Sequence, residues 1–139
     1  MRTKITELSK SIKCLVRKRL VANTPEEAVR QSLIRRMIVD LGYPKGLIAV
    51  EKQIESRRFD LVCYTQAMSP LLLVECKAEK FGDAAEAQAF GYNATIKAPF
   101  ICLASLNEVK LLWHEKSGKI ASVPFLPTFA ELYAISQRV

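Results

Sequence analysis

The stretch PLLLVECK, residues 70–77, constrains the fold more than any other segment of the chain. Its apolar residues are typical of a buried β-strand, yet it ends in a carboxylate and an ammonium two positions apart. Because side chains alternate between the faces of a strand, Glu75 and Lys77 share one face. Two opposite charges at the end of a buried strand are costly unless they pair or bind something. Asp60 interrupts another apolar run upstream, so the remaining residues are interpreted against Asp60, Glu75 and Lys77.

Length and composition favour one globular unit. The chain has 139 residues, half of them hydrophobic and a quarter charged, so we expect a single domain over residues 1–139 with one core. The four cysteines are far apart, no CxxC pair is present and there is one histidine, so a zinc site is not expected. Buried reduced thiols fit a cytoplasmic protein better.

The N-terminal segment is strongly basic. Its first twenty residues hold seven Lys and Arg side chains against one acidic side chain, a net +6 within a total of +7. Apolar residues at roughly helical spacing predict an amphipathic helix over residues 3–20, so residues 1–22 would form a basic helical extension. Such charge indicates nucleic acid as a partner, although a solvated helix face would look the same. No apolar leader or membrane-length run is present, so we expect no membrane partner.

A second helix has a clear start signal. Thr24 is the predicted N-cap, Pro25 the first helical residue, and Glu27 would complete a capping box with Thr24. The helix should continue to about residue 41 and end at Gly42. A later helix over residues 84–96 would be capped by Asp83, and a short one would run from residue 128 to about 136.

The other apolar runs predict strands. They cover residues 47–54, 57–64, 71–77, 100–104, 109–114 and 120–123. Short connections favour an antiparallel meander for the first three strands, and the third is apolar on both faces, which is typical of a central strand. A helix precedes the fourth strand, which should therefore lie parallel to the third by a right-handed crossover. The fold class is α/β, with helices on a mixed sheet.

Asp60 and Glu75 fall on successive strands of this meander. Two carboxylates brought together repel, and one keeps its proton unless a cation lies between them. A hard cation such as Mg²⁺ would bind both, with the backbone carbonyl of Cys76 as a further ligand. Lys77 could then position a water or stabilise charge on a phosphate, which is the chemistry of phosphodiester hydrolysis. The alternative is a structural ion pair between Lys77 and either carboxylate.

Asp60 followed by Glu75-Cys76-Lys77 resembles the signature of the PD-(D/E)XK nuclease superfamily. The chain is most similar to the N-terminal nuclease domain of type I restriction enzyme R subunits, particularly its small stand-alone relatives. The resemblance implies a restriction-endonuclease-like αβββαβ core, in which a mixed sheet with an antiparallel meander is flanked by helices. The matching segments lie within residues 15–105: TPEEAVRQ (24–31), GYPK (42–45), AVEK (49–52), RFDLV (58–62), LLVECKA (72–78), and Gln88 through Tyr92 and Asn93.

The resemblance also implies roles for individual residues. Asp60 and Glu75 would be metal ligands and Lys77 the catalytic lysine. Glu27 would complete the site, with Glu26 as the alternative, although a purely capping role would also explain Glu27.

Gln88 and Tyr92 match a Q-x-x-x-Y motif that the family places beside the active site, where Gln88 would serve catalysis and Tyr92 would contact or orient substrate. Their spacing puts them on one helix face. A helix face with one exposed polar residue and one half-buried ring would show the same spacing. In place of the family's Asn-Gly pair after the fourth strand, this chain has residues 105–107.

The predicted function is a Mg²⁺-dependent DNA endonuclease-like domain, with Mn²⁺ as a substitute metal. The 139 residues leave no room for a helicase motor, so the expected partners are DNA and a helicase or restriction-system subunit, and a homo-oligomer is left open. Arg57 and Arg58 would touch backbone phosphates or lie in a solvated turn. Glu51 is interpreted as an exposed strand residue that could alternatively support the site. The competing interpretations are a catalytically silent nucleic-acid-binding or adaptor module and a structural protein whose basic N-terminus binds an acidic partner.

Overall fold

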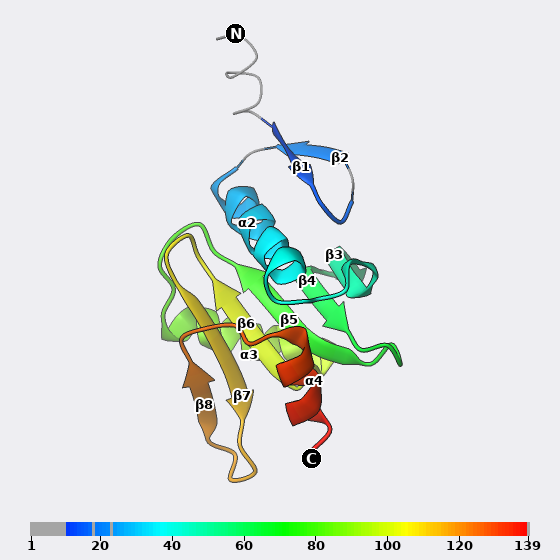
Figure 1. Cartoon of the computed structure of the whole chain (residues 1–139). Helices are drawn as coiled ribbons and strands as arrows, with labels where there is room; N and C mark the ends of the chain where they lie inside the picture. Colours follow the sequence, from blue (N-terminus) through cyan, green and yellow to red (C-terminus); the bar gives the residue numbers. More distant parts are fainter. Residues whose placement is uncertain (1–10, 18, 23, 139) are drawn as a thin grey trace, which may run out of the picture.

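The computed structural model describes residues 11–17, 19–22 and 24–138. At the centre of Figure 1 lies a six-stranded sheet, and its strands follow the order β3-β4-β5-β6-β7-β8. The strands are β3 (Ile48–Ile54), β4 (Arg57–Tyr64), β5 (Pro70–Cys76), β6 (Phe100–Ala104), β7 (Val109–His114) and β8 (Ile120–Val123). All six were predicted within one residue of these bounds.

The pairing of the strands confirms the predicted mixed sheet. β3, β4 and β5 form an antiparallel meander, and β6 lies parallel to β5 with Leu72 opposite Phe100 and Cys76 opposite Ala104. β7 and β8 continue antiparallel. Six of the seven residues of β5 are buried, which confirms β5 as a central strand. The sheet therefore places the end of β5 between the first half of β4 and the end of β6.

Helices cover both faces of the sheet. Helix α2 (Pro25–Val39) and helix α4 (Phe129–Ser136) lie on the near face in Figure 1, and α3 (Asp83–Ile96) lies on the far face. The core divides accordingly, since Ile34 and Leu132 pack with Leu72, whereas Ala89 packs with Leu103. This arrangement confirms the predicted restriction-endonuclease-like α/β fold. In the part of the chain that the structure describes, no helix is both long and apolar enough to cross a membrane.

The prediction of a helix over residues 3–20 is wrong for the part of this range that the structure describes. Residues 1–10, 18 and 23 lie outside the described residues, but β1 (Ser11–Cys14) and β2 (Arg19–Ala22) pair antiparallel as a hairpin. Residues 11–14 alternate polar and apolar side chains, which is the period of a strand. The prediction considered all of residues 3–20, where the apolar residues have roughly helical spacing, and therefore overlooked the alternation in this short segment.

Two predicted helix caps also differ from the structure. Thr24 accepts the expected hydrogen bond from the Glu27 N–H at 3.1 Å, but the Glu27 carboxylate bonds to arginines instead of completing the capping box. Asp83 is the first residue of α3, and the N-cap is Gly82, which has no side chain to cap the helix. A reciprocal capping box does form at α4, between Thr128 and Glu131.

Candidate active site

Asp60 and Glu75 meet at the end of β5, as the sequence predicted. The Cys76 backbone N–H donates to Asp60 Oδ2 at 2.8 Å, which holds the Asp60 carboxylate beside the last residues of β5. Glu75 is 7% exposed, and its Oε1 has no hydrogen-bond partner among the described residues. A buried, unpaired carboxylate oxygen is costly, and in a native protein it calls for an explanation such as an ion or a catalytic role.

The protonation state of Glu75 follows from this environment. Burial, together with a hydrogen bond to Asp60 and the negative charge of Asp60, raises the pKa of the Glu75 carboxyl to about 9, although Lys77 acts in the opposite direction. With no cation between the two carboxylates, Glu75 therefore keeps its proton at neutral pH. A divalent cation would displace that proton.

Lys77 extends the site toward α3. Its backbone N–H donates to the Ala104 carbonyl at 2.8 Å, which prolongs the pairing of β5 with β6 beyond Cys76. Its ammonium donates to Gln88 Oε1 at 3.1 Å. A groove of about 560 Å³ runs along these two residues, and Glu26 lies on its wall. The structure thus brings Gln88 to Lys77, and it places Glu26 rather than Glu27 on the groove.

Tyr92 lies one helical turn beyond Gln88 on α3. Its ring packs edge-on against Phe59 of β4, with ring centroids 6.1 Å apart. The Arg57 guanidinium lies 5.2 Å from the centre of the same ring, which is within the range of a cation–π interaction. Arg57 and Arg58 are both exposed at the start of β4. Arg57, which lies on the same strand as Asp60, is thereby held beside Tyr92 of α3, while Arg58 is exposed.

Glu27 lies in an ion-pair network next to this site. Arg30 Nε donates to Glu27 Oε2 at 2.6 Å, and Arg17 Nη2 donates to Glu27 Oε1 at 2.8 Å. Gln31 Nε2 donates to Oε2 as well, at 3.3 Å. Burial alone would raise the pKa of the Glu27 carboxyl, but the two guanidinium groups hold it below its ordinary value. Both carboxylate oxygens are in use, and the role of Glu27 as a metal ligand stays a prediction.

Arg30 is the centre of the network and was not singled out from the sequence. Besides Glu27, its guanidinium donates to Asp60 Oδ1 at 3.1 Å and to Glu51 Oε1 at 3.2 Å. Burial alone would lower the pKa of Arg30, but Glu27, Asp60 and Glu51 raise it well above its ordinary value. The sequence offered no local signal, because Arg30 lies 21 and 30 residues from two of its partners.

The backbone is distorted where Glu51 faces Asp60. The β3–β4 ladder pairs Val50 with Leu61 and Lys52 with Phe59 but omits the residues between them. Glu51 has a φ of +52°, a left-handed conformation that is uncommon outside glycine and costs free energy. Its carboxylate is tied to Arg17 and Arg30, so Glu51 is part of the site and the preferred interpretation as an exposed strand residue is wrong.

The donor set at the end of β5 suits a small hard cation. Within residues 11–17, 19–22 and 24–138, no three His, Cys, Asp or Glu side chains gather as metal ligands. Mg²⁺ commonly takes only one or two carboxylates and keeps several waters. Asp60 and the unpaired oxygen of Glu75 supply two such carboxylates, and the Cys76 carbonyl as a further ligand stays a prediction.

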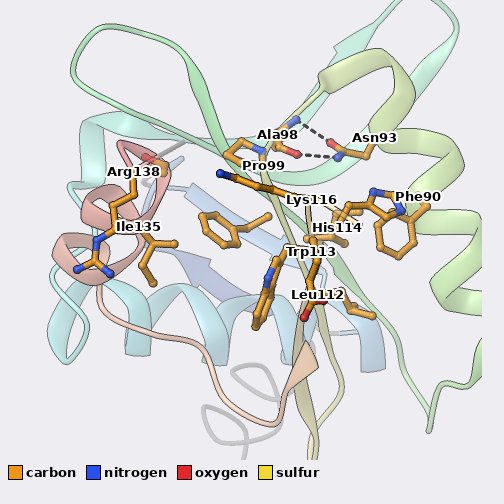
Figure 2. A pocket seen from close by; sticks show the side chains of 14 residues that line it. Phe90, Asn93, Ala98, Pro99, Leu112, Trp113, His114, Lys116, Ile135 and Arg138 are labelled. Atoms are coloured by element: carbon orange, nitrogen blue, oxygen red, sulfur yellow. Dashed lines mark hydrogen bonds between the residues drawn. The ribbon is translucent and has the colours of Figure 1, made fainter. Parts of the chain in front are cut away.

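Another cavity, of about 580 Å³, lies away from these residues (Figure 2). Its walls are mostly apolar and include Trp113 and Ile135. The Asn93 amide bonds to both the N–H and the carbonyl of Ala98, as the dashed lines in Figure 2 show. Asp60, Glu75 and Lys77 do not line this cavity, and of these three residues Lys77 alone lines the groove next to Gln88.

Comparison with known families agrees with this geometry. Residues 25–127 match a family described as the type I restriction enzyme R protein N terminus. The chain belongs to this family. The matched residues of the R-protein N-terminal domain include Arg30, Asp60 and Lys77, whereas Arg17 and its hairpin lie outside them.

A solved structure shares the fold. It is a fragment described as the HsdR subunit of a type I restriction enzyme from Vibrio vulnificus YJ016, with a TM-score of 0.57 and 14% sequence identity. The match covers 89% of this R-protein N-terminal domain and 25% of the Vibrio chain, so the domain spans about a quarter of that solved chain. No curated protein matched the chain.

Proposed function

We propose that this domain hydrolyses phosphodiester bonds of DNA with Mg²⁺ as the nuclease part of a restriction system. The observation that carries the proposal is the unpaired, buried Oε1 of Glu75 beside Asp60, with Lys77 two residues further along the same strand face. Membership in the R-protein family supports it. DNA is the proposed substrate, and a helicase or another restriction-system subunit is the proposed partner.

Each residue has a role that its position supports. Asp60, Glu75 and the Cys76 carbonyl would hold the Mg²⁺, which supplies Lewis acidity and an acidified water when bound. The Lys77 ammonium stabilises negative charge on the phosphate that is attacked. Gln88 orients that ammonium by accepting its hydrogen bond at 3.1 Å.

Lys77→Ala should abolish cleavage because no other ammonium among the described residues donates to Gln88. The measurement is the nicking or linearisation of plasmid DNA by the full chain with Mg²⁺ or Mn²⁺. Lys80→Ala is the matched control, since Lys80 is exposed on the same groove, and this variant should cut normally. Intact DNA under both metals, with protein shown to be folded, would count against the proposed function.

One observation favours a second candidate, a silent DNA-binding module. Both Asp60 oxygens already accept hydrogen bonds, from Arg30 and from the Cys76 N–H, so the carboxylate is partly satisfied without a metal. In that case Asp60→Asn should leave DNA binding unchanged in a gel-shift assay, and no metal should support cleavage.

A further inference from the structure

Three carboxylates from three elements converge on one guanidinium in this fold. Glu27 comes from α2, Glu51 from β3 and Asp60 from β4, and each accepts a hydrogen bond from Arg30 at 3.2 Å or less. The Arg30 side chain is only 9% exposed. The guanidinium is thus the cation that these three carboxylates share, and around it they form no three-residue metal-ligand group in the described part of the chain.

Arg17 belongs to the same cluster, but unlike Arg30 it pairs only with Glu27 and Glu51 among the carboxylates of the described residues. It binds the remaining oxygens of Glu27 and Glu51, at 2.8 and 2.9 Å, and these are its two carboxylate partners among the described residues. Three carboxylates and two guanidinium groups leave one net negative charge, which is near balance for a partly buried site. Arg30 connects this cluster to Asp60, the carboxylate proposed to hold Mg²⁺.

We propose that the Arg30 guanidinium fills a cation position in the site, so that the domain binds one divalent ion, on the Glu75 side of Asp60, and no second ion on the Glu27 side. The proposal rests on the proposed function for the identity of the first ion. Arg30 is then a positioning residue, because it fixes Asp60 Oδ1 and leaves only the Glu75 side open to metal. The strained backbone of Glu51 is part of the same arrangement, since it brings a third carboxylate to Arg30.

Removing Arg30 should create a metal site. In Arg30→Ala the carboxylates of Glu27, Glu51 and Asp60 no longer share a cation, and the truncated side chain leaves space for an ion and its waters. Three oxygen-donor side chains from fixed elements are then available to a hard divalent cation. Arg17→Ala is the matched control, because it removes the same charge from two of these carboxylates while Arg30 stays in place.

The experiment counts Mn²⁺ ions bound to the full chain by electron paramagnetic resonance titration, which is independent of cleavage. Wild type and Arg17→Ala should bind the same number of ions, and Arg30→Ala should bind one more. The additional ion should disappear in the double variant Arg30→Ala/Glu51→Gln. Circular dichroism of each variant establishes that it is folded.

The outcomes separate this inference from the proposed function. If wild type neither cuts DNA nor binds Mn²⁺ while Arg30→Ala gains one ion, the proposed function fails and the cation role of Arg30 stands. Equal ion counts in wild type and Arg30→Ala would overturn the inference. If Arg30→Ala does not fold, the number of ions bound by the wild type tests the inference. A wild type that binds two ions, one of which is lost in Glu51→Gln, would overturn it. A wild type that binds a single ion upholds it.

Discussion

Glu75 is the residue whose charge state the fold controls most directly. Its carboxyl has a pKa of about 9 because it is buried against Asp60, whereas an unfolded chain would ionise it near 4.5. Folding therefore retains a proton that unfolding releases at neutral pH. The stabilisation from the protonated form is complete below about pH 4.5 and is lost progressively as the pH rises toward 9.

Glu75→Gln should consequently be more stable than wild type at neutral and alkaline pH. The amide cannot ionise and can donate to Asp60 as the protonated acid does, so the gain should reach about 2 to 4 kcal/mol at pH 8 and shrink toward pH 5. Urea unfolding of both proteins in the presence of a chelator at pH 5, 6.5 and 8 measures this difference. A difference that stays constant with pH would contradict the assignment of the raised pKa to Glu75.

At the scale of single residues, the sequence predicted the site only where a linear motif existed. Asp60 could be found because it interrupts an apolar strand, and Glu75 and Lys77 because they fall at the end of the next strand that the hydrophobic pattern defines. Gln88 could be found because, together with Tyr92, it matches the Q-x-x-x-Y motif of the family that the chain resembles. Arg30 and the role of Glu51 could not, since their contacts join residues 21 or more positions apart and depend on how α2 lies on the sheet.

At the scale of elements, the bounds of the six strands of the main sheet were predicted to within one residue from their apolar runs. The β1–β2 hairpin was not predicted. Its residues carry both a helical and an alternating pattern, and tertiary contacts decide between them. One such contact is made by Arg17, which lies between β1 and β2 and reaches Glu27 on α2 and Glu51 on β3. The hairpin is thus tied to the site by side-chain ion pairs.

Arg17→Ala should loosen the hairpin without unfolding the domain. The change removes two partly buried ion pairs, so amide hydrogen exchange in β1 and β2 should rise by about tenfold or more, whereas exchange in β5 should stay unchanged. Hydrogen exchange with mass spectrometry measures both regions at once. Arg58→Ala, an exposed change on another strand, is the control and should leave the hairpin as it is. Unchanged exchange in Arg17→Ala would show that other interactions hold the hairpin.

At the scale of the whole molecule, the topology followed from the order of elements. A meander and a helical crossover allow few sheets, and the parallel pairing of β5 with β6 was predictable for that reason. The distribution of charge over the surface was less predictable. The N-terminal basic segment suggested a DNA contact, yet the charge of Arg17 is taken up by ion pairs inside the protein. A surface for DNA, the proposed substrate, therefore has to be sought elsewhere on the domain by experiment.

Two pairs of basic residues, in different parts of the sheet, allow the location of a DNA-binding surface to be tested. Arg57, which lies over the Tyr92 ring, and Arg58 begin β4, and Lys116 and Lys119 lie in the exposed turn between β7 and β8. If DNA runs past Tyr92 toward the groove, Arg57→Ala/Arg58→Ala should reduce the slope of log affinity against log salt by about two, because each arginine would neutralise one phosphate. Fluorescence anisotropy of labelled duplex DNA across a salt series measures the slope.

Lys116→Ala/Lys119→Ala removes the same charge from the other turn and should leave the slope unchanged, because long-range attraction is screened beyond about 10 Å at 0.1 M salt. Equal reductions in the two double variants would mean that DNA responds to total charge rather than to the surface beside Tyr92. A wild-type affinity that does not change with salt would instead favour a protein partner, because neutralising phosphates releases counterions. The comparison therefore decides whether the groove beside Lys77 and Gln88 continues into a DNA-binding surface.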